Sequence, residues 1–363
     1  MANYTTIDDP SAFFQCTLYV GDGNGSGQAI THGGNSDLQA DWIWIKNRTD
    51  AENHSLTDSV RGGGKGLLSN SSDAESNNNS NGYLSSFNSD GFTTANAGVY
   101  NNANAKNYVS WNWKAGTSVS GNTGGSGTAK TYTGSVNTDA GFSIIRYIGN
   151  STAGHTIPHH LGTTPAWIIC RTISAAKEWD VYHHKLASSP ERDYIVLNTN
   201  AAAAGATDAA DKWNNTAPTS SVVTLGDSSQ LNTNDGTCIM YAFSERKGYS
   251  KFSSYTGNGN ADGPMIWTGF KPAFVLIKVT STTNDWEIHD NKRGSSNVIN
   301  AILQPNLSDA ESTSGREIDF LSNGFKLRNS NSQNNLSGGT FIYMAFAESP
   351  FVTGASAIPT TAR

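Results

Sequence analysis

Short runs of alternating apolar and polar residues recur along the chain and predict β-strands rather than helices. In three places alternate positions carry large apolar side chains, while the residues between them vary. These runs are Val109/Trp111/Trp113, Ile239/Tyr241/Phe243 and Ile342/Met344/Phe346. A period of two is typical of a strand with one buried face. Each run therefore predicts a strand whose large side chains face a core.

A second set of runs is apolar on both faces and ends on a basic residue. The runs are Trp42 to Ile45 before Lys46, Trp167 to Cys170 before Arg171, and Phe274 to Ile277 before Lys278. Strands that are apolar on both faces are usually covered on both sides. We therefore expect these three to be central strands.

The chain repeats itself, which explains why each pattern occurs three times. The string Ser-Asp-Ala-Glu-Ser stands at 72–76 and again at 308–312, and Phe-x-Ser-(Asp/Asn)-Gly-Phe stands at 87–92 and 320–325. A Tyr-x-Gly step opens each copy, at Tyr19, Tyr147 and Tyr255. A period of about 110 residues is longer than the units of solenoid proteins, which indicates three tandem domains. Positions that differ between the copies are where function is expected.

Composition sets the fold class. Only 36% of residues are hydrophobic and 15% charged, and Gly (37 residues), Ser, Thr and Asn are abundant. Such residues favour turns over helices, and turn signals every 8–12 residues between short strands are typical of β-sandwiches. We predict an all-β protein of three tandem β-sandwich domains of similar fold, jelly-roll or lectin-like. The expected divisions are an N-terminal arm (1–14), repeat 1 (15–116), a flexible Gly/Ser-rich linker (117–140), repeat 2 (141–248), repeat 3 (249–351) and a C-terminal tail (352–363). Repeat 1 is expected to swing on the linker.

Charge and cysteine content exclude several classes of function. The net charge is −6 and no basic run occurs, so no nucleic-acid partner is expected. No apolar run is long enough to span a membrane, and the first residues lack the pattern of a signal peptide. We expect synthesis in a cytoplasm, with release by lysis if the protein leaves it, no membrane insertion, and three buried or half-buried free thiols at Cys16, Cys170 and Cys238.

No pattern predicts catalysis, so the chain is not expected to be an enzyme and no catalytic residue is assigned. The segment Asp22–Gly27 matches the first half of a calcium loop, but the twelfth position is Gly33, so a turn is favoured over calcium. Histidines gather in repeat 2, and solvated loop residues are favoured over a zinc or nickel site. They are His155, His159, His160, His183 and His184. No metal ligand and no cofactor are assigned.

Several longer strings carry a resemblance to proteins of tailed phages, particularly marine ones. They are Thr5 to Ser11, Asp41 to Arg48, Asp58 to Gly62, Trp111 to Ala115, Phe270 to Lys278 and Ala345 to Phe351. The chain resembles a repeat family found in phage tail fibres and other virion proteins. That family has no agreed catalytic residues, so the resemblance transfers none. Repeat 2 departs most from the pattern, because it lacks the Arg-Gly step and Ser-Asp-Ala-Glu-Ser.

The resemblance implies a non-enzymatic virion protein on the particle surface, and we expect a capsid decoration or head knob protein. A tail fibre or receptor-binding adhesin for host surface glycans is the alternative, and a carbohydrate-active depolymerase is a third. The expected partners are other virion proteins of capsid or tail, a second copy of the chain, and a host surface glycan.

Two groups of apolar residues are candidates for contact with a partner. The arm carries four of them, which are expected to dock in a partner's groove: Tyr4, Ile7, Phe13 and Phe14. Deleting residues 1–14 is expected to leave a folded protein. Trp213 and Trp267 have no counterpart in the other repeats and are expected at the surface.

Overall fold

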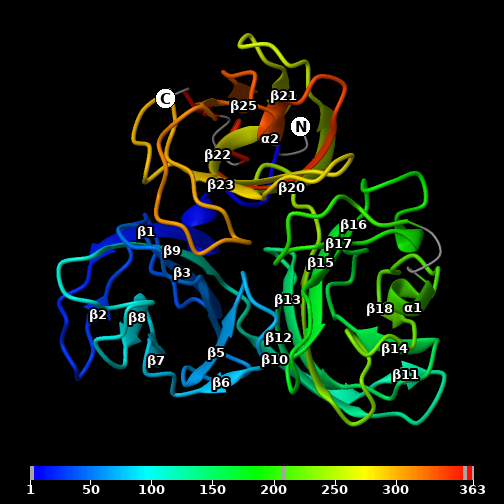
Figure 1. The fold of residues 1–363 in the computed structure, drawn as a ribbon. Coiled ribbons are helices and arrows are strands. Elements are labelled where there is room, and N and C mark those ends of the chain that lie inside the picture. Colours follow the sequence, from blue (N-terminus) through cyan, green and yellow to red (C-terminus); the bar gives the residue numbers. More distant parts are fainter. Residues whose placement is uncertain (1–3, 206–209, 355–357, 362–363) are drawn as a thin grey trace.

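The computed structural model describes residues 4–205, 210–354 and 358–361. Within them the regular secondary structure is almost entirely antiparallel strand, with two one-turn α-helices and two 3-10 turns, which confirms the all-β prediction. Figure 1 shows three lobes around a common centre: lobe 1 in blue and cyan, lobe 2 in green, and lobe 3 in yellow to red. Each lobe pairs a larger sheet with a three-stranded one. The finer jelly-roll or lectin-like topology stays a prediction.

Lobe 1 follows the 3-10 turn η1 (Pro10–Ala12) and contains the first nine strands. Its larger sheet has the order β1-β9-β3-β4-β5-β6 and its smaller sheet the order β2-β8-β7. The strands are β1 (Phe14–Val20), β2 (Ala29–Ile30), β3 (Trp42–Asn47), β4 (Ser55–Asp58), β5 (Lys65–Leu68), β6 (Ser76–Asn77), β7 (Leu84–Asn88), β8 (Gly91–Thr94) and β9 (Asn107–Trp113).

Lobe 2 contains the next ten strands, the 3-10 turn η2 (Pro190–Arg192) and helix α1 (Ala210–Trp213). Its sheets have the orders β10-β12-β13-β19-β15-β16-β17 and β11-β14-β18. The strands are β10 (Thr117–Asn122), β11 (Gly124–Gly125), β12 (Thr131–Asn137), β13 (Phe142–Ile148), β14 (His155–Pro158), β15 (Trp167–Thr172), β16 (Asp180–His183), β17 (Ile195–Val196), β18 (Val222–Leu225) and β19 (Thr237–Phe243).

Lobe 3 contains the last seven strands and helix α2 (Ser332–Asn335). Its sheets have the orders β20-β26-β22-β23 and β21-β25-β24. The strands are β20 (Ser250–Thr256), β21 (Met265–Trp267), β22 (Phe270–Val279), β23 (Glu287–Asp290), β24 (Ile318–Leu321), β25 (Gly324–Leu327) and β26 (Thr340–Pro350).

The three large sheets bury one face each in a single central core that all lobes share. Strand β9 sends Trp111 and Trp113 into this core, where they meet the side chains of Phe274 and Phe346 from lobe 3. The opposite face of each large sheet packs on the small sheet of its own lobe, in three separate clusters. The predicted core faces of the alternating strands are confirmed, since their large side chains are all buried: Trp111, Trp113, Tyr241, Phe243, Met344 and Phe346. The expectation of only one buried face is wrong, because the residues between them on β9, β19 and β26 are buried against the small sheets.

Two expectations about the connections are wrong. Residues 117–140 form no flexible linker, because β10 and β12 pair in register and extend the large sheet of lobe 2. Their polar sequence reads as a linker because β10, at the edge of the sheet, leaves most of its residues exposed to solvent. Lobe 1 is also not free to swing, since Trp42 stacks on Tyr241 of lobe 2 with ring centroids 4.5 Å apart.

Candidate functional site

The surfaces between the lobes carry hydrogen bonds and buried ion pairs, and their backbone contacts repeat around the ring of lobes. A loop of each lobe donates a backbone N–H to the end of a central strand in the next lobe. Glu75 donates to Ile173 (2.8 Å), Ala203 to Thr280 (2.9 Å) and Glu311 to Arg48 (3.0 Å). The order is lobe 1 to lobe 2, lobe 2 to lobe 3, and lobe 3 to lobe 1. The ring is therefore closed by equivalent backbone contacts.

A buried ion pair reinforces the contact between lobes 1 and 2. The Arg61 guanidinium lies 2.5 Å from Asp58, and both side chains are fully buried. Asp58 also accepts a hydrogen bond from the Tyr241 hydroxyl of lobe 2 (2.6 Å). Glu75, the glutamate of the repeated Ser-Asp-Ala-Glu-Ser string, lies 3.3 Å from Arg61. A buried charge needs such a full set of partners, because an unpaired one is costly to desolvate.

Lobe 3 builds the same cluster against lobe 1. Arg293 lies 2.6 Å from Asp290 and 3.3 Å from Glu311, and Asp290 accepts from the Trp111 indole nitrogen of lobe 1 (3.0 Å). Burial raises the pKa of Asp290, but the charge and hydrogen bonds of Arg293 outweigh it and hold that pKa below its ordinary value. Glu311 also pairs with Arg48 across the interface, at 2.7 Å. The Asp290 carboxylate is thus kept ionised by its partners and serves the structure of the interface.

Lobe 2 replaces this ion pair with a neutral set. His183 occupies the position that Asp58 and Asp290 have in the other two lobes. The strand register shows this, because each of the three residues pairs with the first aromatic residue of the central strand: Trp167, Trp42 and Phe274, respectively. The position of the arginine is taken by Leu186, which is buried. Burial lowers the pKa of His183 well below its ordinary value, so this imidazole is neutral. The fold therefore accepts either an ion pair or a neutral pair at this place.

The Tyr-x-Gly step is a second repeated feature, and its hydrogen bonds fix one end of each lobe. A buried asparagine accepts a hydrogen bond from the backbone N–H that follows each step: Asn102 from Asp22 (3.1 Å), Asn232 from Asn150 (2.8 Å) and Asn335 from Asn258 (2.8 Å). In all three lobes a Cβ on the glycine would lie 2.3 Å from a backbone carbonyl oxygen. Only glycine fits such a close approach.

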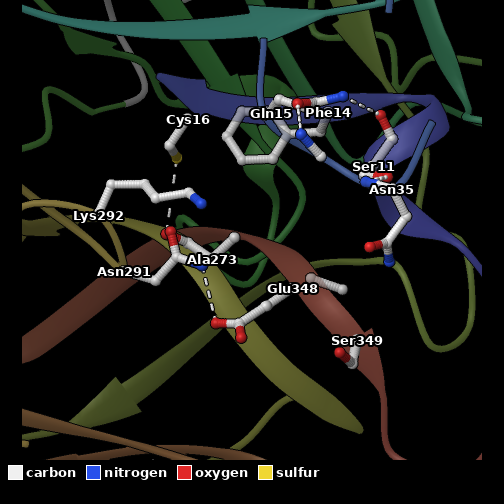
Figure 2. Close-up of a pocket in the computed structure, with 13 residues that line it drawn as sticks. Ser11, Phe14, Gln15, Cys16, Asn35, Ala273, Asn291, Lys292, Glu348 and Ser349 are labelled. Atoms are coloured by element: carbon white, nitrogen blue, oxygen red, sulfur yellow. Dashed lines mark hydrogen bonds between the residues drawn. The ribbon is translucent and has the colours of Figure 1, made fainter. Parts of the chain in front are cut away.

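In the described part of the chain, a cavity lies at each of the three interfaces between lobes. The cavity between lobes 3 and 1 measures about 240 Å³, and Figure 2 shows Asn291 donating to Glu348 on its wall (2.7 Å), with Cys16 facing Ala273. The cavity between lobes 1 and 2 measures about 580 Å³ and is lined by Asp41 and several serines. The cavity between lobes 2 and 3 measures about 480 Å³ and reaches Trp267.

The expected docking arm packs against its own chain, so that prediction is wrong. Ile7 and Phe14 are buried in the central core, and Phe14 stacks on Phe346 with ring centroids 5.1 Å apart. Phe13 is half-buried against Tyr249. Tyr4 donates its hydroxyl to Gly269 of lobe 3 (2.6 Å). These apolar side chains find their groove within the protein because the central core extends past the start of β1.

The two tryptophans predicted at the surface behave differently. Trp213 is only 1% exposed, because helix α1 turns its indole into the core of lobe 2 beside Tyr182. Its expected surface role is wrong. Trp267 is 53% exposed on strand β21, as predicted.

The histidines of lobe 2 are mostly not solvated. His155, His159 and His183 are buried, and burial lowers the pKa of each. His155 bridges Asn232 and Thr123 at 2.9 and 2.7 Å, which gives it a role in the fold. Only His160 is exposed. Across the described ranges, no group of three His, Cys, Asp or Glu side chains is placed to hold a metal ion.

Two further interpretations from the sequence are confirmed. Asp22–Gly27 forms turns in which Asp22 accepts from the N–H of Asn24 (2.8 Å) and Asn24 from that of Ser26 (2.9 Å). The three cysteines are free and buried. None of the helices in the described part of the chain is long and apolar enough to cross a membrane.

Sequence reasoning missed the buried ion pairs. Their signal was present, because the exactly repeated Ser-Asp-Ala-Glu-Ser strings carry Glu75 and Glu311, which reach the two arginines. The repeated glutamates were not matched to Arg61 and Arg293, because in each lobe the two residues lie far apart along the chain and meet only in the folded protein.

Comparison with known proteins gives one family. Residues 9–350 match the model of a domain of unknown function (DUF7483), and the chain belongs to that family. The match runs through all three lobes, in agreement with their shared core. No curated protein and no solved structure matches the chain.

Proposed function

We propose that this member of the family is a non-enzymatic structural protein displayed on the surface of a bacteriophage particle, as a capsid decoration or head knob protein. The observation that carries the proposal is the closed ring of lobes. Among the residues kept between repeats, Glu75 and Glu311 of the Ser-Asp-Ala-Glu-Ser strings bind the next lobe. The aspartates paired with Arg61 and Arg293 accept hydrogen bonds from a neighbouring lobe, and the Tyr-x-Gly steps fix the end of each lobe. Because the repeated residues serve the fold, they suit a rigid structural module whose outer loops are displayed on the particle surface. We propose the location on a phage particle from the resemblance of the sequence to virion proteins.

The packing of the arm changes how attachment would work. Because Ile7 and Phe14 belong to the protein's own core, we no longer assign docking to the arm. Attachment to other virion proteins, or to a second copy of the chain, would then use the exposed outer surfaces of the lobes. Exposed apolar residues there include Leu18 and Val20 on β1, which lies at the edge of its sheet.

Mass spectrometry of purified particles tests this proposal directly. The protein is expected in stoichiometric amounts with the particle, and immunogold labelling is expected on the head. Gold on the tail instead would favour the alternative, a tail fibre or receptor-binding adhesin. Absence from washed, infectious particles would refute both roles.

A further inference from the structure

The cavity between lobes 2 and 3 has an exposed tryptophan on its rim. It is lined from lobe 2 by Glu245 and Lys247, and from lobe 3 by Lys251, Trp267 and Thr268. Trp267 is 53% exposed, whereas every other tryptophan in the chain is buried. An exposed indole at the rim of a cavity is open to contact with a ligand, because it offers an apolar ring face together with a polar N–H group.

The fold does not need a tryptophan at this position. In lobe 3 the register places Ile266 opposite Phe325, and in lobe 1 it places Ile30 opposite Phe92. The residue after the isoleucine is Trp267 in lobe 3 and the exposed Thr31 in lobe 1. Both isoleucines are buried, so they hold the small sheet in place. The indole is thus an addition of lobe 3 alone.

Aromatic contacts fix the orientation of the Trp267 ring. Phe351 packs against it edge to face, with ring centroids 5.5 Å apart, and Tyr4 packs against Phe351 in the same way at 6.2 Å. The ammonium of Lys247 lies 4.4 Å from the centre of the Tyr4 ring. A ring supported from one side presents its other face with little loss of conformational entropy on binding.

Polar groups lie next to this aromatic face. Lys251 lies 2.9 Å from Glu245, and both side chains keep about a third of their surface exposed. Glu245 also accepts a hydrogen bond from the backbone N–H of Phe252 (3.0 Å), which positions its carboxylate. The cavity thus offers an acceptor and two ammonium donors, fixed within one volume.

We propose that this cavity binds a pyranose unit of a glycan, with the sugar ring lying on the Trp267 indole. A pyranose has one face of C–H groups, which suits an aromatic ring, and a rim of hydroxyls that can both donate and accept hydrogen bonds. Glu245 accepts from these hydroxyls, and Lys251 and Lys247 donate to them. The volume of about 480 Å³ lies within the range of small-molecule sites. A purely aliphatic ligand would use the indole but leave the paired charges without hydrogen-bonding partners.

The two equivalent cavities provide an internal comparison. The cavity between lobes 3 and 1 keeps a glutamate, Glu348, but its aromatic residue, Phe14, is buried in the core. The cavity between lobes 1 and 2 is lined by small residues of β10 and β12 and contains no aromatic side chain. Only the lobe 2–lobe 3 cavity combines an exposed aromatic ring with hydrogen-bonding charges, so we expect one glycan site per chain.

The test uses the full chain and defined probes. Binding of hexasaccharides of glucose, mannose, galactose, N-acetylglucosamine and uronic acids is measured by glycan array and then by titration calorimetry. Trp267→Ala is expected to weaken binding of any positive probe by about tenfold or more, as expected for loss of an aromatic anchor. Trp267→Phe is expected to keep part of the affinity. Val298→Ala, which alters an exposed apolar residue of lobe 3 outside the cavity, is the matched control and should bind like the unaltered protein.

Thermal unfolding of each variant separates loss of the site from loss of the fold. The proposal is supported if a probe binds and only the Trp267 variants lose affinity at unchanged melting temperature. It is overturned if no probe binds the unaltered protein, or if Trp267→Ala and Val298→Ala bind alike. Failure here leaves the particle location untouched, because mass spectrometry of particles tests that separately.

Discussion

Replacing Arg61 with leucine tests whether the buried ion pairs hold the lobes together. Arg61 donates to Asp58 and to the backbone carbonyl of Leu56 (3.1 Å), and it lies 3.3 Å from the Tyr241 hydroxyl of lobe 2. After the change Asp58 stays buried between two lobes with no opposite charge beside it. Removing one partner of a buried pair costs about 3–5 kcal/mol. We expect Arg61→Leu to lower the free energy of unfolding by that amount.

Lobe 2 supplies the matched control, since it carries His183 and Leu186 at the corresponding positions. The double change Asp58→His with Arg61→Leu therefore gives lobe 1 the neutral pair that lobe 2 already uses. An imidazole at 58 can accept the hydrogen bond of Tyr241. Replacing a whole buried ion pair with a packed neutral pair is often close to neutral, so we expect the double variant to recover at least about 2 kcal/mol.

Equilibrium unfolding in guanidinium chloride, followed by tryptophan fluorescence, measures both changes. The signal reports the core because all tryptophans except Trp267 are buried. A loss below about 1 kcal/mol for Arg61→Leu, which is the range of surface ion pairs, would refute the reasoning. A double variant no more stable than the single one would show that the cost lies in lost packing rather than in the stranded carboxylate.

Three further predictions concern pH, the arm and the repeated glycine. Burial lowers the pKa of His32 and of His159 to about 4, so the unfolded chain takes up these two protons at a higher pH than the folded protein does. As the pH falls from about 6.5 to 4, each histidine should therefore lower the free energy of unfolding by about 1.4 kcal/mol per pH unit. Asp180 acts in the opposite direction, since burial raises its pKa to about 7 despite the nearby Lys212. Unfolding curves measured over a pH series test the sum, and a net gain of stability on acidification would contradict the expected loss from the two histidines. Deleting residues 1–14 removes the buried Ile7 and Phe14 and should cost about 2–5 kcal/mol for each, so a melting temperature equal to that of the full chain would contradict the packing of the arm. Gly257→Ala places a Cβ 2.3 Å from the Leu336 carbonyl oxygen and should lower the melting temperature, whereas Gly25→Ala, with open space around it, should change little.

Much of the fold was readable from the sequence because its period and its repeats are local. Alternation over five residues identifies which face of β9, β19 and β26 carries the large side chains of the central core, although both faces of these strands are buried. The Tyr-x-Gly steps marked the start of each copy, and the structure adds the reason, a carbonyl too close for any side chain.

What the sequence left open depends on contacts between residues far apart in the chain. The sequence predicted three sandwiches with repeat 1 free to swing on a linker, but nothing local indicates that Trp42 of repeat 1 stacks on Tyr241 of another lobe. For the same reason Trp213 and Trp267, both without counterparts, could not be distinguished before their packing was known.

The sequence by itself determined the strands, their buried faces and the threefold repeat, because each depends on side-chain spacing along one stretch of backbone. The tertiary structure alone decided that the lobes close around one core, that the arm and residues 117–140 belong to the fold, and that one cavity combines an exposed indole with charged groups. Burial and charge pairing arise between surfaces that meet only after folding, and spacing along the chain does not encode which surfaces meet.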